Sequence, residues 1–218
     1  QDDIVLFEDE TRTSELVRFN MLRQQISMPD RQPNLSLADF IAPLESGVND
    51  YLGAFVVTSG IGVADLVQRY ELDHDDYHAI MVKALADRLA EAFAEWLHQK
   101  VRREWGYAVD EEMPFADLVA DRYRGIRPAF GYPSCPDHSE KFNLCDHLDG
   151  RAIGVGLTES AAMTPAASVS GLYFSNPEAR YFILGKVDRD QVRSYAVRKG
   201  FEISDVERWL TQKLSYDP

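Results

Sequence analysis

The sequence predicts an α+β fold in a single domain, with a twisted, largely antiparallel sheet, packed helices and one long helix. Three observations predict this class. Short apolar runs recur in groups, one helical pattern covers residues 75–104, and two further helical patterns follow one another near the C-terminal end. Strands in runs and helices in blocks are typical of α+β proteins, whereas strict strand–helix alternation is typical of a doubly wound sheet. We therefore expect one α+β domain over residues 1–218.

The N-terminal quarter contains two predicted strands with helical segments between them. Residues 4–7 form a short apolar run flanked by acidic residues, and residues 54–58 form a second run that ends at glycines. Residues 35–43 form a short amphipathic segment. Between the first strand and this segment, apolar residues recur at every third position and predict a helix: Leu16, Phe19 and Leu22.

The longest predicted element is the helix at about 75–104. Acidic residues occupy its first turn, where the helix dipole favours them. Apolar residues recur at helical spacing, and we expect this stripe to face the core: Tyr77, Ile80, Met81, Ala84, Leu85, Leu89, Ala92, Phe93, Trp96 and Leu97. Carboxylates also recur every four residues along the helix, at Asp87, Glu91 and Glu95. On the residues alone, this line of carboxylates is a solvated face.

In the C-terminal half, the predicted helices and strands alternate less regularly. A short helix is predicted at 115–123, followed by strands at 152–157, 168–174 and 181–184. A helix is predicted at 188–200, with Gly200 as its stop signal. A capping-box pattern then begins the last helix at Ser204.

The composition excludes several classes of protein. The formal net charge is −13 at pH 7 and the acidic residues are spread along the chain, so a phosphate-binding surface for nucleic acid is not expected. An acidic chain suits a cationic partner surface. No apolar run approaches the ~18 residues that span a membrane. Acidic residues stand where a signal peptide would be basic and then apolar. We therefore expect a cytoplasmic protein with no membrane partner.

Residues 124–142, which we call the signature loop, carry the strongest functional signal. Their sequence is RGIRPAFGYPSCPDHSEKF. Three prolines and two glycines exclude a regular helix and predict a rigid, turning segment. This segment carries a permanent cation at Arg127, an aromatic hydroxyl at Tyr132, a thiol at Cys135 and an imidazole at His138. On composition alone, it is either a ligand-binding loop or a rigid surface loop.

The pattern Arg-Gly-Ile-Arg-Pro-Ala-x-Gly-Tyr-Pro-x-Cys-Pro-x-His resembles the signature of the C-terminal activation domain of cobalamin-dependent methionine synthase. Four further segments follow in that family's order, at 75–93, 157–163, 168–175 and 189–200. The resemblance covers nearly the whole chain. It implies that the family's domain begins well before Gln1, so residues 1–218 would lack its N-terminal part, including an acidic ligand to the amino group of the cofactor.

The resemblance implies a site that binds S-adenosylmethionine. Arg127 matches the residue that holds the carboxylate of the cofactor, a task that suits the planar fork of a guanidinium. The alternative role of Arg127 is a surface or structural ion pair. Ala129 and Gly131 would offer backbone groups and clearance. Tyr181 and Phe182 match a segment that binds the cofactor through its main chain.

Five further residues are assigned by the same resemblance. Glu91 and Asp121 match acids near the positively charged sulfonium or ammonium group, although Asp121 replaces a longer acid. Tyr132 matches an aromatic at the mouth of the cobalamin face. Asp87 and His138 would face the cobalamin-binding domain. The aromatic residues have an alternative role in ordinary packing.

The implied function is reactivation of methionine synthase, the methyltransferase that makes methionine from homocysteine and methyltetrahydrofolate. The cofactor of this domain would be S-adenosylmethionine, with cobalamin held by a partner domain and zinc only in the homocysteine module of the parent enzyme. The expected partners are the cobalamin-binding domain and flavodoxin or a flavoprotein reductase. The methyl transfer needs positioning and electrostatics rather than a general base. No catalytic residue is therefore assigned, and the isolated domain is expected to be inactive alone.

Two alternatives come from other functional classes. Cys135, His138, Cys145 and His147 have spacings compatible with tetrahedral zinc, which would make the chain a metal-stapled binding module. The other is a Rossmann-type methyltransferase, but Gly154-Val-Gly156 lacks the third glycine of that motif. A zinc assay on protein purified without added metal distinguishes the first alternative.

Overall fold

The computed structural model describes residues 2–26, 33–110 and 112–218 as a mixture of helices and short strands. The chain forms two compact units. Unit 1 contains residues 1–53, 124–143 and 172–218, and unit 2 contains residues 54–123 and 144–171. The predicted α+β class is confirmed. Within the described ranges the strands form three small two-stranded sheets, β1–β2, β3–β6 and β4–β5.

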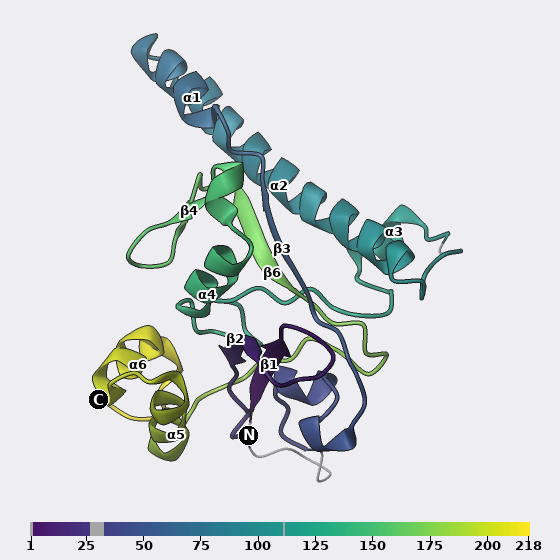
Figure 1. The fold of residues 1–218 in the computed structure, drawn as a ribbon. Helices are drawn as coiled ribbons and strands as arrows, with labels where there is room; N and C mark the ends of the chain where they lie inside the picture. Colours follow the sequence, from purple (N-terminus) through teal and green to yellow (C-terminus); the bar gives the residue numbers. More distant parts are fainter. Residues whose placement is uncertain (1, 27–32, 111) are drawn as a thin grey trace. The chain divides into compact units, whose positions relative to one another are not determined.

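The elements follow one another along the chain as drawn in Figure 1. The strands are β1 (Asp3–Phe7), β2 (Glu15–Asn20), β3 (Gly53–Thr58), β4 (Gly156–Leu157), β5 (Met163–Thr164) and β6 (Ser168–Tyr173). The α-helices are α1 (Val63–Leu72), α2 (Asp76–Glu104), α3 (Phe115–Val119), α4 (Glu140–His147), α5 (Arg189–Lys199) and α6 (Ile203–Trp209). Short 3-10 helices cover Leu37–Phe40, Leu44–Ser46, Gly150–Ile153 and Thr211–Lys213.

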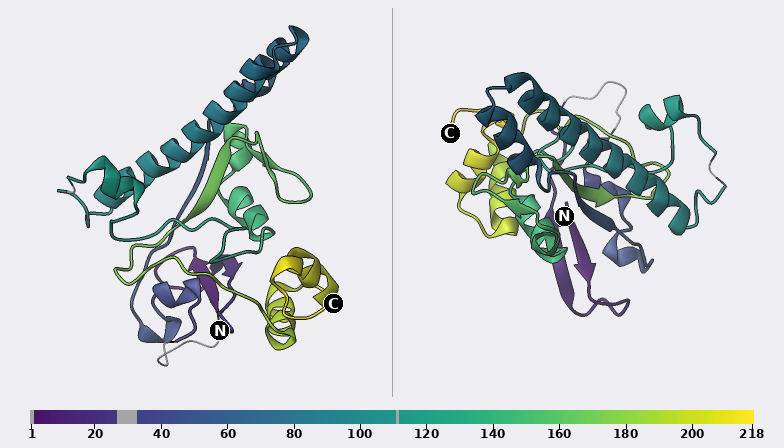
Figure 2. Two further views of the ribbon diagram at one scale, coloured as in Figure 1. Left: turned by 180° about the vertical axis from the view of Figure 1, so that it is seen from behind. Right: turned by 90° about the horizontal axis from the view of Figure 1, so that it is seen from above.

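Unit 1 begins with an antiparallel hairpin, which is well seen in the second view of Figure 2. β1 confirms the predicted first strand, but the predicted helix around Phe19 is wrong. β2 pairs with β1 in a register that places Ile4 opposite Phe19, and both side chains are buried. The turn between the strands is closed by a hydrogen bond of 3.0 Å from the Glu8 N–H to the Ser14 carbonyl.

The C-terminal helices of unit 1 share one hydrophobic cluster with the end of the hairpin segment. Its buried members are Leu22, Leu184, Val187, Val192, Tyr195, Ala196, Val206, Leu210 and Leu214. α5 ends at Gly200 in the left-handed conformation, which confirms the predicted stop. α6 begins at Ile203 with Glu202 as its cap, so the predicted capping box at Ser204 lies inside the helix.

Unit 2 contains the long helix. α2 confirms the predicted helix, and the carboxylate of Asp75 caps it by accepting a hydrogen bond of 3.1 Å from the His78 N–H. α1 packs against α2, as both views in Figure 2 show. The strands of this unit are joined to one another, since the Ser59 N–H donates to the Ala167 carbonyl at 3.0 Å.

The prediction that the large apolar stripe of α2 faces the core is wrong. The buried residues of α2 are Ala79, Ala86, Ala90, Ala94, His98 and Arg102. The large apolar residues are mostly exposed, from 37% for Met81 to 67% for Tyr77. Small side chains allow close approach of neighbouring backbone, and here the Ser59 hydroxyl donates to the Ala86 carbonyl within unit 2.

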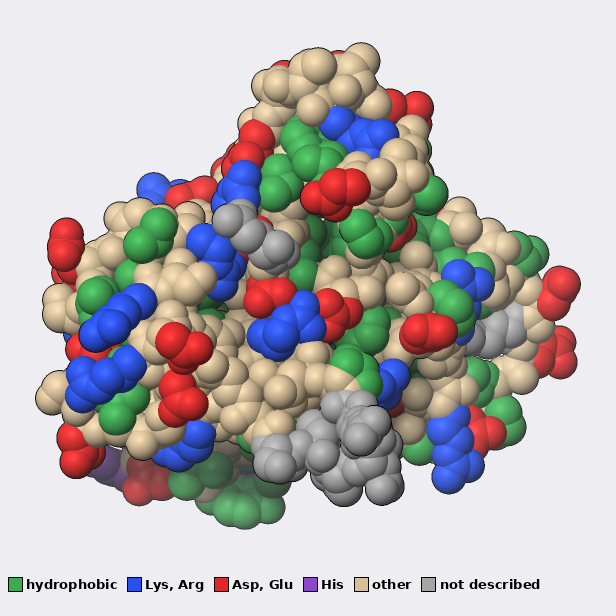
Figure 3. All heavy atoms as spheres, turned by 90° about the horizontal axis from the view of Figure 1, so that it is seen from below, with side chains coloured by type: hydrophobic (Ala, Val, Ile, Leu, Met, Phe, Trp, Pro, Cys, Tyr) green, Lys and Arg blue, Asp and Glu red, His purple; other side chains and the backbone are tan. Residues whose placement is uncertain are grey.

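Other details also differ from the sequence prediction. The predicted strand at 152–157 is a 3-10 helix followed by the two-residue strand β4, and the segment at 181–184 has no regular strand ladder. No helix in the described ranges is both long and apolar enough to span a membrane. On the face shown in Figure 3, acidic and basic side chains are interspersed rather than separated by sign.

Candidate functional site

The signature loop is held between two segments of unit 1. On one side, Ile126 and Phe174 exchange two backbone hydrogen bonds of 3.1 and 3.0 Å, and the Leu172 N–H donates to the Pro128 carbonyl at 3.0 Å. On the other side, the Leu184 N–H donates to the Pro133 carbonyl at 2.9 Å. The loop therefore has a fixed backbone, as its prolines predict.

Arg127 and Tyr181 lie next to one another. The backbone N–H of Arg127 donates a 3.0 Å hydrogen bond to the Tyr181 hydroxyl, across 54 residues of sequence. Tyr181 is 44% exposed, and Arg127 is half-buried. The two residues that the resemblance assigns to one ligand thus contact one another within unit 1.

The loop makes a tight turn between Ala129 and Cys135. The Cys135 N–H donates to the Tyr132 carbonyl at 3.0 Å, and the Gly131 N–H donates to the Cys135 carbonyl at 2.8 Å. The Ala129 carbonyl accepts from the Tyr132 N–H at 3.2 Å and from the Cys135 thiol at 3.1 Å. Both acceptor positions of that carbonyl are used, which leaves the Ala129 N–H as the backbone group for a ligand.

Gly131 has φ +96°, and the His138 ring lies over its α-carbon. A Cβ at this position would be 2.2 Å from Cε1 of His138. His138 therefore occupies the space that a side chain at position 131 would need. Burial, and then the neighbouring ammonium of Lys141 with its Nζ 3.0 Å from Nδ1, lower the pKa of His138. A neutral imidazole can accept a hydrogen bond from that ammonium.

Ser134 fixes Phe182 to the loop. The Ser134 hydroxyl donates to the Phe182 carbonyl at 2.6 Å, and the Phe182 N–H donates to the same hydroxyl at 3.1 Å. The main-chain donor of Phe182 is thus already used within the protein. Of the predicted main-chain pair, Tyr181 is the better placed to bind a ligand through its backbone.

The far end of the loop is anchored by a buried charge cluster that sequence reasoning missed. The carboxylates of Asp137 and Glu140 flank the ammonium of Lys199, which lies 3.2 Å from Asp137 and in direct contact with Glu140. The Tyr195 hydroxyl donates to Asp137 at 2.7 Å. All four side chains are almost completely buried. The only signal in the sequence is a pair of acids in the loop and a lysine in α5.

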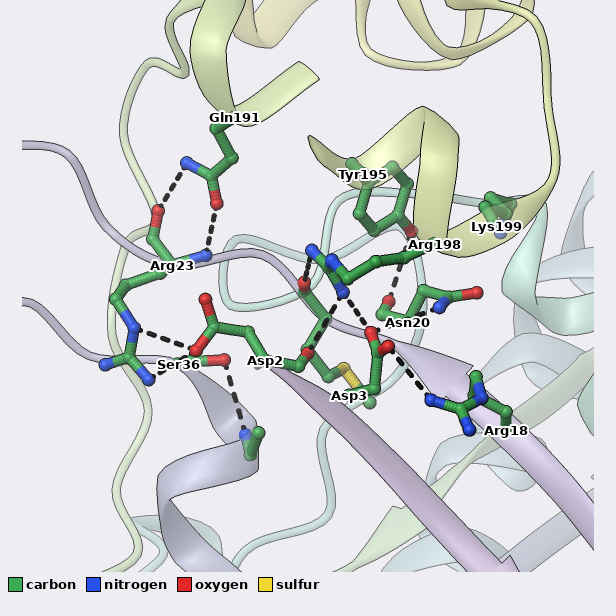
Figure 4. Close-up of polar contacts among 12 residues, drawn as sticks. Asp2, Asp3, Arg18, Asn20, Arg23, Ser36, Gln191, Tyr195, Arg198 and Lys199 are labelled. Carbon is green, nitrogen blue, oxygen red and sulfur yellow. Dashed lines mark hydrogen bonds and ion pairs between the residues drawn. The ribbon is translucent and has the colours of Figure 1, made fainter. Parts of the chain in front are cut away.

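This cluster is part of a larger polar network between α5 and the hairpin, shown in Figure 4. Arg198 contacts the Asp3 carboxylate and donates to the Met21 carbonyl at 3.0 Å. The Tyr195 hydroxyl also lies 3.1 Å from the Asn20 carbonyl. The network therefore joins α5, the hairpin and the signature loop within one unit.

Three predicted site residues, Asp87, Glu91 and Asp121, belong to unit 2. Asp87 and Glu91 are exposed on α2. Asp121 is exposed, has φ +52° and accepts a hydrogen bond from the Tyr123 hydroxyl. Their assignment to the same site as Arg127 stays a prediction. His138 and Tyr132 are exposed residues of unit 1.

The prediction of a zinc-stapled module is not supported. Across the described ranges, no group of three or more His, Cys, Asp or Glu residues is arranged to hold a metal ion. Cys135 and Cys145 are both buried and not joined by a disulfide. Burial, and then the nearby carboxylate of Asp137, raise the pKa of Cys135 far above its usual range, so this thiol is a poor metal ligand at neutral pH.

A cavity of about 670 Å³ lies elsewhere in unit 1, between β1 and residues 38–50. None of the candidate residues lines it. Arginines in its wall are engaged within the protein, as Arg23 forms ion pairs with Asp2 and Asp39 at 2.6 Å each. It is not the predicted ligand site.

The family model for the activation domain of vitamin B12-dependent methionine synthase matches residues 1–200 of this chain. The chain belongs to this family. A similar solved structure is the crystal structure of the MetH reactivation domain bound to AdoHcy, which is 51% identical and superposes with a TM-score of 0.96. The match covers 99% of this chain and 67% of that one. The resemblance expected from the signature loop is thereby confirmed.

The family relates the site described above to a class of enzyme. The parent enzymes are methyltransferases, and the activation domain is one part of them. In this activation domain, the family's signature residues form one hydrogen-bonded surface around Arg127 and Tyr181. The buried cluster at Lys199 holds that surface in place.

Proposed function

We propose that this activation domain binds S-adenosylmethionine on the signature loop and supports the reductive methylation of cob(II)alamin to methylcobalamin. Through this reaction it would reactivate cobalamin-dependent methionine synthase. The observation that carries the proposal is the contact between Arg127 and Tyr181 on a loop with a fixed backbone. The related reactivation domain was crystallised with AdoHcy, the demethylated form of the same cofactor.

The residues present fit this cofactor. Arg127 is half-buried, and the planar fork of a guanidinium suits the carboxylate of the methionyl moiety. The N–H of Ala129 and the main chain of Tyr181 offer polar groups to the rest of the ligand. We assign a smaller part to Phe182, because its N–H is bonded to Ser134. Gly131 acts by admitting His138 rather than the ligand.

Charge complementarity supports the acidic part of the proposed site. The bound sulfonium supplies a transferable methyl group, and a carboxylate at short range stabilises its positive charge. Glu91 and Asp121 are proposed for this role. Asp87, Tyr132 and His138 are proposed to face the cobalamin-binding domain. All three residues are exposed.

The proposed partners follow from the reaction. The cobalamin is held by a separate domain, and the electron comes from flavodoxin or a flavoprotein reductase. Zinc belongs only to the homocysteine module of the parent enzyme. We place the protein in the cytoplasm, where methionine biosynthesis takes place, and we expect no reactivation by this domain alone.

The decisive experiment is calorimetric titration with S-adenosylmethionine and AdoHcy, using the 218-residue chain and the complete parent enzyme. Arg127→Ala is expected to weaken binding roughly tenfold to hundredfold, because a charge-assisted bidentate contact is lost. Arg127→Lys is expected to recover only part of that loss, because lysine restores the charge but not the fork. Arg208→Ala is the matched control, since this arginine is 71% exposed on α6.

The same variants are then tested for reductive methylation in the parent enzyme. The proposal predicts parallel losses of affinity and of reactivation for Arg127→Ala, with an unchanged melting temperature. If Arg127→Ala lowers the melting temperature by several degrees while affinity and reactivation stay at the level of Arg208→Ala, the arginine is structural and the proposed site is wrong.

A further inference from the structure

Tyr123 follows α3 in unit 2, and two side chains of α2 hold its ring. The guanidinium carbon of Arg102 lies over the face of the ring, 3.7 Å from its centre. The His98 ring stands nearly perpendicular to the Tyr123 ring, with 5.1 Å between the ring centres. Arg102 and His98 are fully buried, and their spacing of one helical turn places them on the same side of α2. The Tyr123 ring is therefore fixed on the last turns of the long helix.

The fixed ring directs a hydroxyl at an acidic residue of the proposed site. The Tyr123 hydroxyl donates a hydrogen bond of 2.5 Å to Oδ1 of Asp121. Asp121 has a left-handed backbone with φ +52°, and its N–H donates to the Leu118 carbonyl at 3.2 Å. Aspartate is one of the few residues besides glycine that adopt this conformation readily. Backbone and hydroxyl together set the direction of a carboxylate on an exposed residue.

Direction matters more for this carboxylate than for a longer one. The resemblance places a longer acid at this position, whereas the side chain of Asp121 has a shorter reach. The attraction between two charges falls with the distance between them, so a short side chain stabilises a sulfonium only in the rotamers that point toward it. An exposed side chain without a fixed partner is distributed over several rotamers. The hydrogen bond from Tyr123 selects one of them.

We propose that Tyr123 is a positioning residue for the binding of the sulfonium and that it acts through Asp121. This inference rests on the function proposed above. The hydrogen bond has two opposite effects, because it withdraws some negative charge from the carboxylate and also fixes its direction. We expect the second effect to be larger, since a hydrogen-bonded carboxylate keeps its net charge, whereas a carboxylate turned into water is screened from the cofactor.

An arginine, a tyrosine ring and a carboxylate meet in the same way elsewhere in the chain. In unit 1, the guanidinium carbon of Arg189 lies 4.0 Å from the centre of the Tyr216 ring, and the Tyr216 hydroxyl donates to Glu207 at 2.8 Å. None of these three residues is assigned to the cofactor site. The arrangement alone therefore does not indicate binding, and what distinguishes Tyr123 is its acceptor. Tyr216→Phe is the matched control.

The test is calorimetric titration of the complete parent enzyme with S-adenosylmethionine and with AdoHcy. AdoHcy lacks the transferable methyl group and the positive charge on sulfur, so the ratio of the two affinities measures what the enzyme gains from that charge. Tyr123→Phe removes the hydroxyl and keeps the ring. It is expected to lower the preference for S-adenosylmethionine roughly threefold to tenfold, the effect of losing one hydrogen bond, with the affinity for AdoHcy unchanged. A purely structural role would leave the ratio as it was.

A double-variant cycle shows whether Tyr123 acts through Asp121. Asp121→Asn removes the negative charge and is expected to lower the affinity ratio by at least as much as Tyr123→Phe. Adding Tyr123→Phe to Asp121→Asn should lower the ratio no further, because the group that the hydroxyl positions has lost its charge. Tyr216→Phe is expected to leave the ratio unchanged.

Three results would overturn the inference. An unchanged or increased ratio for Tyr123→Phe would show that the hydroxyl does not position the carboxylate. An unchanged ratio for Asp121→Asn would show that this carboxylate does not act on the sulfonium. Additive losses in the double variant would show that Tyr123 acts independently of Asp121.

Failure of the proposed function has a different signature. Arg127→Ala would then leave both affinities at the level of Arg208→Ala, and the inference about Tyr123 would fail with it. If Arg127→Ala weakens the binding of both ligands while Tyr123→Phe leaves their ratio unchanged, the cofactor site stands and only the role of Tyr123 is wrong.

Discussion

Gly131 allows the signature loop to turn beneath the His138 ring. Its φ of +96° is strained for any residue with a Cβ, and a Cβ would lie 2.2 Å from the ring. Gly131→Ala is therefore expected to lower the free energy of unfolding by more than the roughly 1–2 kcal/mol that a positive φ alone costs. Chemical denaturation of the purified variant measures this loss.

Two further variants distinguish the backbone strain of a positive φ from steric overlap with the His138 ring. Gly47→Ala also has a positive φ, of +70°, but nothing lies within 4 Å of the added Cβ, so only the backbone cost is expected. Adding His138→Ala to Gly131→Ala should recover part of the loss. Equal losses for Gly47→Ala and Gly131→Ala would show that the His138 contact does not matter.

Lys199 neutralises two buried carboxylates, and its removal is expected to be severe. Lys199→Met leaves Asp137 and Glu140 buried beside one another without a cation. Breaking a buried ion pair in this way typically costs about 3–5 kcal/mol. Thermal and urea unfolding should show this loss, whereas Lys213→Met, at the partly exposed end of the chain, should have little effect.

Glu140 makes a pH-dependent contribution to stability. Burial raises the pKa of Glu140 above its ordinary value, and the ammonium of Lys199 opposes this shift only in part. A raised pKa of an acid means that the folded protein binds its proton more tightly than the unfolded chain, so this contribution is complete below the unfolded pKa and is lost as pH rises through the folded pKa.

Glu140→Gln removes this titration. The variant is expected to gain stability relative to the original protein as pH rises above the ordinary pKa of a glutamate and through the raised pKa of Glu140, where the carboxyl of the original protein loses its proton. Urea unfolding at a series of pH values measures the difference between the two proteins. A difference that is constant over this range would show that Glu140 does not titrate with a raised pKa.

At the scale of elements, α2 shows that the size of its side chains decides which face is buried. Ala90 is 1% exposed on the buried face, whereas the preceding residue, Leu89, is 61% exposed. Ala90→Leu is expected to destabilise the chain by about 1–3 kcal/mol through overpacking. Leu89→Ala is expected to change stability by less than about 0.5 kcal/mol.

Urea unfolding of the 218-residue chain measures both variants. A large loss for Leu89→Ala together with a small one for Ala90→Leu would mean that the opposite face is buried.

β2 illustrates why short apolar periodicity is ambiguous. Leu16, Phe19 and Leu22 fit a helical interval, yet Leu16 is 46% exposed and Phe19 is paired with β1. Three residues are too few to distinguish the two periods, and the partner strand decides between them. The longer pattern of α2, in contrast, predicted its bounds almost to the residue.

At the scale of the whole molecule, unit 1 is assembled from three separate stretches of sequence. Its hydrophobic cluster joins Leu22 to residues of α5 and α6. Removal of residues 188–218 is therefore expected to abolish hydrogen-exchange protection in β1, β2 and the signature loop. Protection in α2 should persist, because unit 2 contains none of the removed residues.

Hydrogen exchange followed by mass spectrometry distinguishes the two units directly. The expected loss in unit 1 is more than about a hundredfold in protection factor, since the anchors Tyr195 and Lys199 are deleted. Unchanged protection of the signature loop in the truncated chain would show that the cluster at α5 is not what holds the loop.

The sequence by itself determined the family, the α+β class, the long helix and the loop that carries Arg127, because these depend on local signals such as prolines, glycines, caps and an extended helical period. Only the tertiary structure decided which face of α2 is buried, because both faces are apolar and the choice depends on how closely neighbouring backbone approaches. It alone also revealed the anchor of the signature loop. Lys199 and Glu140 are 59 residues apart, and nothing in a linear pattern indicates that burial would bring two acids to one lysine.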